Sequence, residues 1–435
     1  MSFVYGLTAA AGVALILLYM SKYRWEIKLV DSAVLLAAIA FVVRVLACFV
    51  SEGFPETINT YRIWSDMLRS GGIESFKSVD AHTGFQPGYM YVLYVLGHIR
   101  HFFRIPDGFA QTMLIKMPAI LADCVICLFI YKAARRKSKK QTAWLISLFW
   151  VFNPASVFIS SVLGQTESFY LIFLLLAVYR LTTKNYAFAY AFYAIALMLR
   201  PQNIIFMPLF IYSFYDYFKS LEKVSAKTIA HSVDRLFPGL LIILCMILPF
   251  SEGFNLEPVF RQFTGAFWDN SHISVNAANL YILFGLNWAD GAKKIFGVIP
   301  FWALSLGLTA IIMLISLSVV HGNKRDDRYF FAGAFISVMV FMLGIKMNER
   351  SLLPATAFLL TSLAVRFKDE YLFMYCAFSL SIFVNCAAVL SAYTGYSDVF
   401  ALDLPLGIIA GINIGITIFF IIRAYINNKN EKQWG

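Results

Sequence analysis

The chain has 435 residues, of which 60% are hydrophobic, 17% aromatic and only 14% charged. Soluble domains hold about 25% charged residues, so this composition excludes a soluble protein and predicts an all-α, polytopic membrane protein. The net charge of +11 could suggest nucleic-acid binding, but the basic residues gather in short loops between apolar segments.

Apolar segments recur along the whole chain, so we expect one integral-membrane domain over residues 1–435. At roughly 20 residues per crossing, the sequence predicts a bundle of about thirteen transmembrane helices. The candidate crossings are residues 3–20, 32–51, 110–131, 142–160, 168–183, 186–199, 203–217, 236–251, 298–320, 329–345, 352–365, 371–391 and 405–424.

The distribution of Lys and Arg indicates the orientation of these crossings. Roughly 22 fall in one set of alternate loops, which includes the cluster KAARRKSKK, and roughly 11 fall in the opposite, longer set. The positive-inside rule makes the first set cytoplasmic. We therefore expect an outward N-terminus and a cytoplasmic C-terminus. On this interpretation the Lys and Arg residues determine the orientation in the membrane and do not indicate nucleic-acid binding.

The first outer loop, residues 52–104, combines two helical patterns. Residues 56–68 place apolar side chains on one helical face, and Gly71-Gly72 ends that helix. Residues 87–103 are apolar and aromatic but end in basic residues, which favours a helix lying in the membrane interface rather than a crossing. A polar loop with Asp80 lies between the two helices.

Charged residues inside the predicted crossings include Arg44, Lys116 and Asp123. Charges there are costly and usually face a cavity or a partner. For Arg44 two interpretations are equally open: it faces a functional cavity, or it has a structural role, either reaching the membrane surface or pairing with another residue. Lys116 and Asp123 lie two turns apart, too far for a direct bond, so each needs another partner. Lys116, near the outer end, is the better candidate for a lipid phosphate.

Further polar clusters interrupt the apolar chain on the predicted outer side. Asn153-Pro154 breaks one helix, and a Pro between Arg and Gln marks a second break, which is tolerated where the backbone lines a cavity or is buried in protein. The second outer loop, residues 252–297, mixes aromatic and polar residues that suit stacking and hydrogen bonding to polar rings, although a plain outer cap remains open. Candidate site residues in these clusters are Gln165, Glu167, Arg200, Gln202, Asn276, Glu349 and Arg350.

The six cysteines all fall in apolar segments. Cys124 and Cys127 have zinc-ligand spacing, but no second pair and no nearby histidine accompany them. We therefore expect buried thiols, no metal site and no cofactor.

Several short motifs follow one another in the same order as in a known family. They are NTYRIW, FQPGYMYVL, IKMPAILAD, NPASVFISSVLGQTESF, RPQN, NAANL and NERSLLPA, spread over about 300 residues. On these motifs the chain resembles the C-type (GT-C) polytopic membrane glycosyltransferases, including bacterial members and the lipid-linked glucosyltransferases of the N-glycan pathway. The resemblance implies a multi-pass protein of the bacterial plasma membrane.

The resemblance also implies a reaction. A sugar would pass from a polyprenyl-phosphate donor to a lipid-linked or cell-surface glycan acceptor at the outer face, without a metal. Glu56 would be the general base with Asp80 in reserve. Lys116, Arg200 and Arg350 would hold the donor phosphate, and Gln165, Glu167 and Gln202 would bind hydroxyl groups, with Asn276 and Glu349 completing the substrate site.

The sequence departs from the family at two acidic positions. Where the family has an Asp in the first outer loop, this chain has Thr57, and where the family has a second Asp, this chain has Gly84. A catalytically inactive relative that binds a glycan or a lipid therefore stays open. A transporter or polymerase of lipid-linked oligosaccharides is a third hypothesis, although we see no internal repeat of the kind that transporters show. Each hypothesis requires the distant polar clusters to converge in space.

Overall fold

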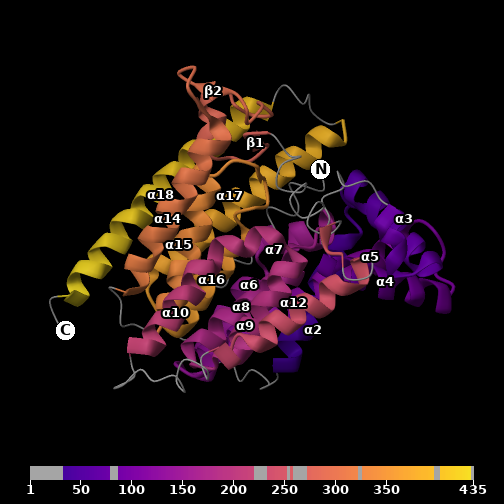
Figure 1. Ribbon diagram of the computed structural model, residues 1–435, viewed down its shortest axis with the longest axis horizontal. Coiled ribbons are helices and arrows are strands. Elements are labelled where there is room, and N and C mark those ends of the chain that lie inside the picture. Colours follow the sequence, from indigo (N-terminus) through magenta and orange to yellow (C-terminus); the bar gives the residue numbers. More distant parts are fainter. Residues whose placement is uncertain are drawn as a thin grey trace.

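The computed structural model describes residues 33–78, 87–219, 233–251, 255–257, 272–321, 326–395 and 402–432. Within these ranges the chain is mostly helical (Figure 1), which confirms that part of the predicted fold class. The first predicted crossing and Asp80 lie outside the described residues.

The helices follow the apolar segments of the sequence. The first group is α2 (Ala33–Cys48), α3 (Pro55–Gly71), η1 (Ile73–Ser78), α4 (Pro87–Phe102), α5 (Phe109–Arg135), α6 (Lys140–Val151), α7 (Pro154–Val157), η3 (Phe158–Val162), α8 (Glu167–Thr182), α9 (Tyr186–Leu199), η4 (Pro201–Phe206) and α10 (Met207–Lys219). The second is α12 (Phe237–Ile247), η5 (Leu248–Phe250), η6 (Leu280–Phe284), α14 (Phe301–His321), α15 (Arg328–Leu343), α16 (Leu353–Val365), α17 (Asp369–Tyr393) and α18 (Asp403–Lys432).

Fewer helices are long enough to cross a bilayer than the sequence predicted. Among the described residues four qualify by length and hydropathy, namely α5, α14, α17 and the 403–426 part of α18. A fifth arises if α6 and the α7–η3 segment, bent by 43°, form one span. The chain is a multi-pass membrane protein, but the predicted thirteen crossings are not confirmed. Several of the remaining apolar helices have only 10–17 residues, below the length that a bilayer requires.

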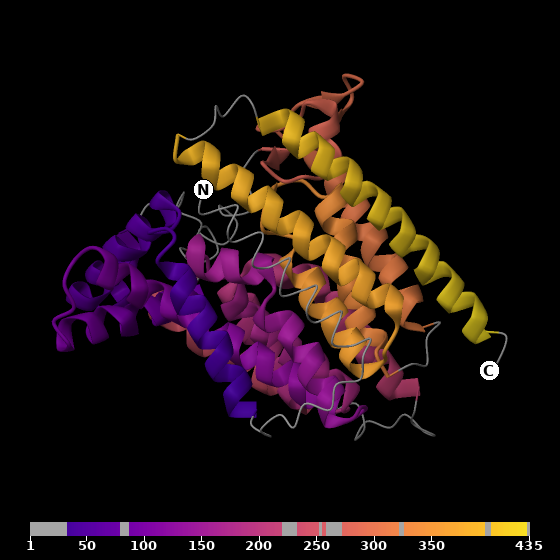
Figure 2. The same cartoon turned by 180° about the vertical axis from the view of Figure 1, so that it is seen from behind.

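Two helices form the centre of the bundle. Helix α5 packs against α2, α6, α8 and α16, and α16 packs against α15, α17 and α5. Almost every residue of α16 is buried, which agrees with a helix that is apolar on all sides. Helices α14 and α18 lie on one side of the bundle, and α3 and α4 lie on the other (Figures 1 and 2). Helix α17 runs between these sides, and its last residue, Tyr393, contacts Phe54 just before α3.

The predicted helix pair of the first outer loop is present. Helix α3 begins at Pro55, a residue suited to a first helical turn, and ends before Gly72, whose φ of 71° is a left-handed conformation that favours glycine. Helix α4 packs closely on α3 because of Gly97. A Cβ atom there would lie 2.3 Å from the backbone oxygen of Ser65.

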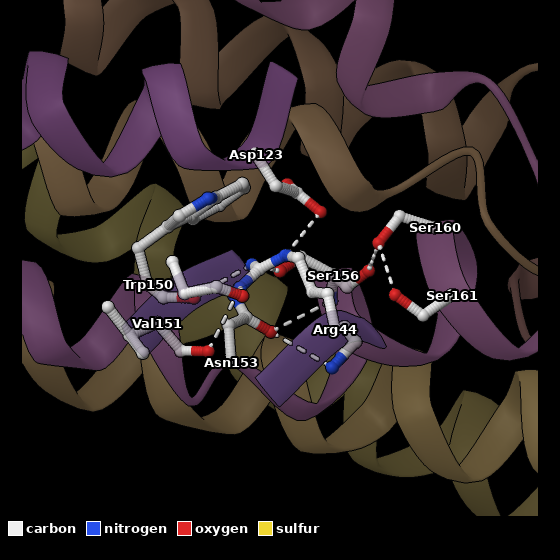
Figure 3. A network of polar contacts seen from close by, with 10 residues as sticks. Arg44, Asp123, Trp150, Val151, Asn153, Ser156, Ser160 and Ser161 are labelled. Carbon is white, nitrogen blue, oxygen red and sulfur yellow. Dashed lines mark hydrogen bonds and ion pairs between the residues drawn. The ribbon is translucent and has the colours of Figure 1, made fainter. Parts of the chain in front are cut away.

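The break between α6 and α7 is stabilised by Arg44 (Figure 3). Its guanidinium group donates to the Trp150 and Val151 backbone oxygens at 3.2 Å each. These carbonyls lie at the C-terminal end of α6, where the regular helical hydrogen bonds stop. Arg44 also binds the Asp123 carboxylate at 2.8 Å, and both side chains are fully buried. Arg44 and Asp123 therefore form a structural pair.

Asn153 begins the next helix at the same break. Its side-chain oxygen accepts hydrogen bonds from the Ala155 and Ser156 amides and from the Ser379 hydroxyl. An Asn at this position supplies the acceptor that the first helical amides need. The Ser379 bond joins the break to α17, so the predicted helix break is a fixed part of the core.

Four short β-strands among the described residues form a small structure at one end of the bundle (Figure 1). Strand β1 (Ser274–Val275) pairs in parallel with β4 (Met347–Asn348), and β2 (Lys294–Ile295) pairs with β3 (Ile299–Pro300). Part of the second predicted outer loop therefore lies directly on the turn that carries Glu349.

Candidate functional site

Four charged side chains from distant parts of the sequence meet in one cluster, which we call the charge cluster. Glu167 Oε1 accepts from Arg200 Nη1 at 2.6 Å and from Arg350 Nε at 2.8 Å. Arg350 Nη1 donates to Glu349 Oε1 at 2.5 Å. Both carboxylates are buried, and the two arginines are about one-fifth exposed. With two charges of each sign, the cluster is neutral.

The local sequence explains how each charge reaches this place. Glu167 is the first residue of α8, where the helix dipole favours a negative charge. Arg200 follows α9 directly, because Pro201 lacks an amide proton and ends the helix. Asn203 donates its side-chain amide to the Ala196 oxygen at 2.8 Å, which ties the turn after Pro201 to the end of α9. Glu349 and Arg350 lie in the turn between β4 and α16.

The Glu167 carboxylate is held in its charged form. Burial alone would raise the pKa of Glu167, but the Arg350 and Arg200 guanidinium groups outweigh burial and hold the pKa below its ordinary value. Arg200 also lies 5.1 Å from the centre of the Tyr170 ring, a cation–π distance. Tyr170, one helical turn after Glu167, is a cluster residue that the sequence analysis missed, although its spacing could have indicated it.

Not every polar group beside the cluster is satisfied. Among the described residues, Glu167 Oε2, the Ser168 hydroxyl and the Tyr89 hydroxyl have no hydrogen-bond partner. All three are buried. Glu167 therefore keeps one acceptor oxygen beyond its two ion pairs.

Gln165 links the cluster region to α3. Its side-chain amide donates to the Thr57 hydroxyl at 3.1 Å. Gly164, with a φ of 70°, allows the close approach, because a Cβ atom there would lie 2.7 Å from Ile58 Cδ1. Thr57, the position at which the resemblance expected an Asp, is therefore a hydrogen-bond partner of Gln165 and has no carboxylate.

Lys116 lies outside the charge cluster. Its side chain is buried, and the ammonium donates to the backbone oxygens of Ser51 and Ser161 at 2.7 Å each and to Val162 at 3.4 Å. Three carbonyls thus occupy the donors that a lipid phosphate would need. In this structure Lys116 holds the end of α2 against the η3 segment.

Glu56 and Gln202 lie at the surface. Glu56 is exposed in the first turn of α3, next to Thr57. Its carboxylate and that of Glu349 both act electrostatically on the Tyr393 hydroxyl, so the two acids share a neighbourhood. Gln202 is exposed two residues after Arg200.

Asn276 belongs to the second outer loop and is buried against the turn that carries Glu349. Its side-chain oxygen accepts from Trp288 Nε1 at 3.0 Å and from the Asn287 amide at 3.1 Å. Its φ of 55° is left-handed, and its backbone pairs with Asn348, the residue before Glu349. These contacts use Asn276 to hold the second outer loop in place.

The structure thus brings Glu167, Arg200, Glu349 and Arg350 together, with Gln165 close by. The other predicted site residues lie apart from the cluster. The Lys116 ammonium is held by backbone oxygens, Asn276 is held by the side chains of its own loop, Glu56 and Gln202 are exposed, and Asp80 lies outside the described residues. Arg200 and Arg350, which were expected to bind a donor phosphate, form ion pairs with carboxylates of the same chain instead.

Comparison with protein families gives a match between residues 68–272 and the family described as GPI transamidase subunit PIG-U. The matched range covers just under half of the chain. A search of the curated proteins gives no match.

This match overturns the function expected from the sequence. The recognition as a C-type glycosyltransferase is wrong, and so are the predicted sugar transfer, the polyprenyl-phosphate donor and the glycan acceptor. The alternatives of an inactive glycosyltransferase-like binding protein, a transporter or a polymerase are not supported either. The structure gives a physical reason, because Thr57 has no carboxylate and Lys116, Arg200 and Arg350 are already paired. The orientation of the termini and the bacterial plasma membrane are also unsupported. Over residues 68–272 the chain is similar to the GPI transamidase subunit PIG-U.

Proposed function

We propose that this protein is a multi-pass membrane subunit of a GPI transamidase type of complex, which attaches a lipid anchor to proteins. The observation that carries this proposal is the match of residues 68–272 to PIG-U. The matched range contains α4, α5, α8 and α9, and therefore the Glu167–Arg200 pair. The partners would be the other transamidase subunits and the protein substrates of the complex.

The charge cluster suits a positioning role in such a subunit. Glu167 and Arg200 belong to the matched part, whereas Glu349 and Arg350 belong to the C-terminal part, so the bond between Glu167 and Arg350 ties the two parts together. Buried, fully paired charges specify one geometry more than they add stability. We assign the cluster the task of holding the turn that carries Glu349 against α8.

Two exposed polar side chains lie next to residues of this region in the sequence and could meet a partner. Glu56 and Gln202 are exposed beside the cluster, and the Gln165–Thr57 bond fixes the start of α3. Interfaces of membrane subunits need polar groups held in a defined geometry, because a mobile charged side chain loses conformational entropy on binding. We propose that Glu56 and Gln202 contact a partner subunit and that the charge cluster positions the elements that carry them.

Anchor attachment in cells tests the proposal. The gene would be deleted in the cells that produce the protein, and attachment of the lipid anchor to a reporter protein would be measured. We expect unanchored reporter to accumulate, and we expect the wild-type gene to restore attachment. Normal attachment in the deletion strain would contradict the proposed function.

Purification in mild detergent adds a second test. The 49.2 kDa chain should elute in a larger complex of fixed stoichiometry that contains other transamidase subunits. Glu56→Gln and Gln202→Ala should weaken this complex, whereas Glu74→Gln, a change of the same chemistry at another exposed position, should leave it intact. A chain that elutes alone, with normal anchoring in its absence, would exclude a subunit role.

A further inference from the structure

A second polar site lies at the opposite end of the bundle. Helix α8 has 16 residues, so Glu167 and Thr182 are separated by roughly 24 Å along the helix. Around Thr182 the structure has a cavity of about 360 Å³, lined by the ends of α5, α8, α10, α15 and α16 and the start of α9. Its volume lies within the range of small-ligand sites.

The cavity carries more positive than negative charge. Its charged lining residues are Arg136, Lys137, Lys184, Arg328, Asp216 and Asp326. Lys137 pairs with Asp326 at 2.5 Å, and Arg328 pairs with Asp216 at 2.7 Å. Within the described part of the chain, Arg136 and Lys184 form no ion pair. Two cations are thus available to an anion that enters the cavity.

Both of these cations lie at the rim of the cavity, where a ring contact orients Arg136 and a fixed turn carries Lys184. Arg136 lies 5.1 Å from the centre of the Tyr179 ring, which orients its guanidinium group while leaving the donors exposed. Lys184 has a left-handed φ of 56°, and its amide donates to the Leu181 oxygen at 3.0 Å, so the turn after α8 is fixed. Both side chains are exposed. A guanidinium and an ammonium group so placed suit a phosphate.

The position of the cavity indicates the source of that phosphate. Helix α5 is long and apolar enough to cross a membrane, and its C-terminal end lines the cavity. The ends of such helices lie at the depth of lipid headgroups, and basic pockets between membrane helices bind anionic headgroups. We propose that this cavity binds the phosphate-bearing headgroup of an anionic phospholipid through Arg136 and Lys184. The site is separate from the charge cluster, and the proposal does not depend on the transamidase function.

Native mass spectrometry of the purified protein tests this site. The probes are dioleoylphosphatidylglycerol as the anionic lipid, dioleoylphosphatidylcholine as the zwitterionic lipid and glycerol 3-phosphate as a soluble phosphate. We expect retention of the anionic lipid only. Equal retention of both lipids, or binding of glycerol 3-phosphate at the same strength, would overturn the assignment to an anionic lipid headgroup.

Charge-removing variants locate the binding. Each basic contact to an anionic lipid is worth about fivefold in affinity, so the double variant Arg136→Gln with Lys184→Gln should lose roughly thirtyfold. The matched control, Lys293→Gln with Lys294→Gln, removes two exposed charges near β2, at the other end of the bundle, and should change affinity less than twofold. An equal loss in both double variants would refute the site.

A third variant guards against misfolding of the double variant. Thr183 is exposed beside Lys184, so Thr183→Glu places a negative charge at the rim without removing either cation. It should also weaken retention of the anionic lipid, and its unfolding temperature without lipid should match that of the wild type. Unchanged retention in a folded Thr183→Glu protein would contradict the proposal.

Discussion

Glu167→Gln is the sharpest test of the charge cluster. The substitution keeps the size of the side chain and removes the negative charge that binds both Arg200 and Arg350. The cluster changes from neutral to a net charge of +1, with Glu349 as its remaining carboxylate. Removing one partner of a buried ion pair destabilises a protein by about 3–5 kcal/mol. Because both arginines keep about one-fifth of their surface exposed, we expect the lower end, about 3 kcal/mol.

Thermal unfolding in detergent, followed by the fluorescence of the 8 tryptophans, measures this loss. For a chain of this size we expect the unfolding temperature to fall by roughly 3 °C. Glu74→Gln is the control, since Glu74 is exposed and the chemical change is identical. Adding Arg200→Gln to Glu167→Gln restores neutrality, so the double variant should lose less than the sum of the single variants. An unfolding temperature of Glu167→Gln equal to that of the wild type would refute the reasoning.

Three further predictions follow from the contacts. The pKa of Glu167 is lowered in the folded state, so its contribution to stability is present at neutral pH and is lost as the pH falls below about 4. On acidification, the unfolding temperature of Glu167→Gln should therefore fall less than that of the wild type. Arg44→Met and Asp123→Asn should each destabilise by about 3 kcal/mol, and a coupling energy near zero in the double variant would contradict the ion pair. Gly97→Ala should loosen α4 from α3 and speed proteolysis after Arg104, whereas Gly307→Ala, where a Cβ atom meets nothing within 4 Å, should not.

The sequence predicted the helices well, whereas the thirteen membrane crossings are not confirmed. Hydrophobic runs determine where a helix forms, and the pair α3 and α4 could be read from amphipathic spacing and glycine signals. A run such as α16 is apolar because it is buried within the protein, so its composition does not show whether it crosses the bilayer. Sequence alone does not separate these two causes of an apolar helix.

The sequence alone also could not predict which charged residues pair with each other inside the protein. The sequence showed that Asp123 and Arg44 each needed a partner, but the two are 79 positions apart and nothing local links them. The same holds for Glu167 and Arg350, which are 183 positions apart. Sequence reasoning found most members of the charge cluster and missed that they neutralise one another. An arginine with no carboxylate partner would be a candidate to bind a phosphate, whereas an arginine paired with a carboxylate has a structural role.

The motifs that suggested a glycosyltransferase have structural uses here, and this explains why they misled. IKMPAILAD contributes Asp123 to the pair with Arg44, and the motif beginning at Asn153 caps the helix after the break. RPQN contributes Arg200 to the charge cluster and Asn203 to a hydrogen bond that ties the turn after Pro201 to the end of α9. These three motifs fall inside residues 68–272, the range that matches PIG-U. Any membrane bundle with the same breaks needs caps and buried pairs, so such motifs indicate packing and do not identify a reaction.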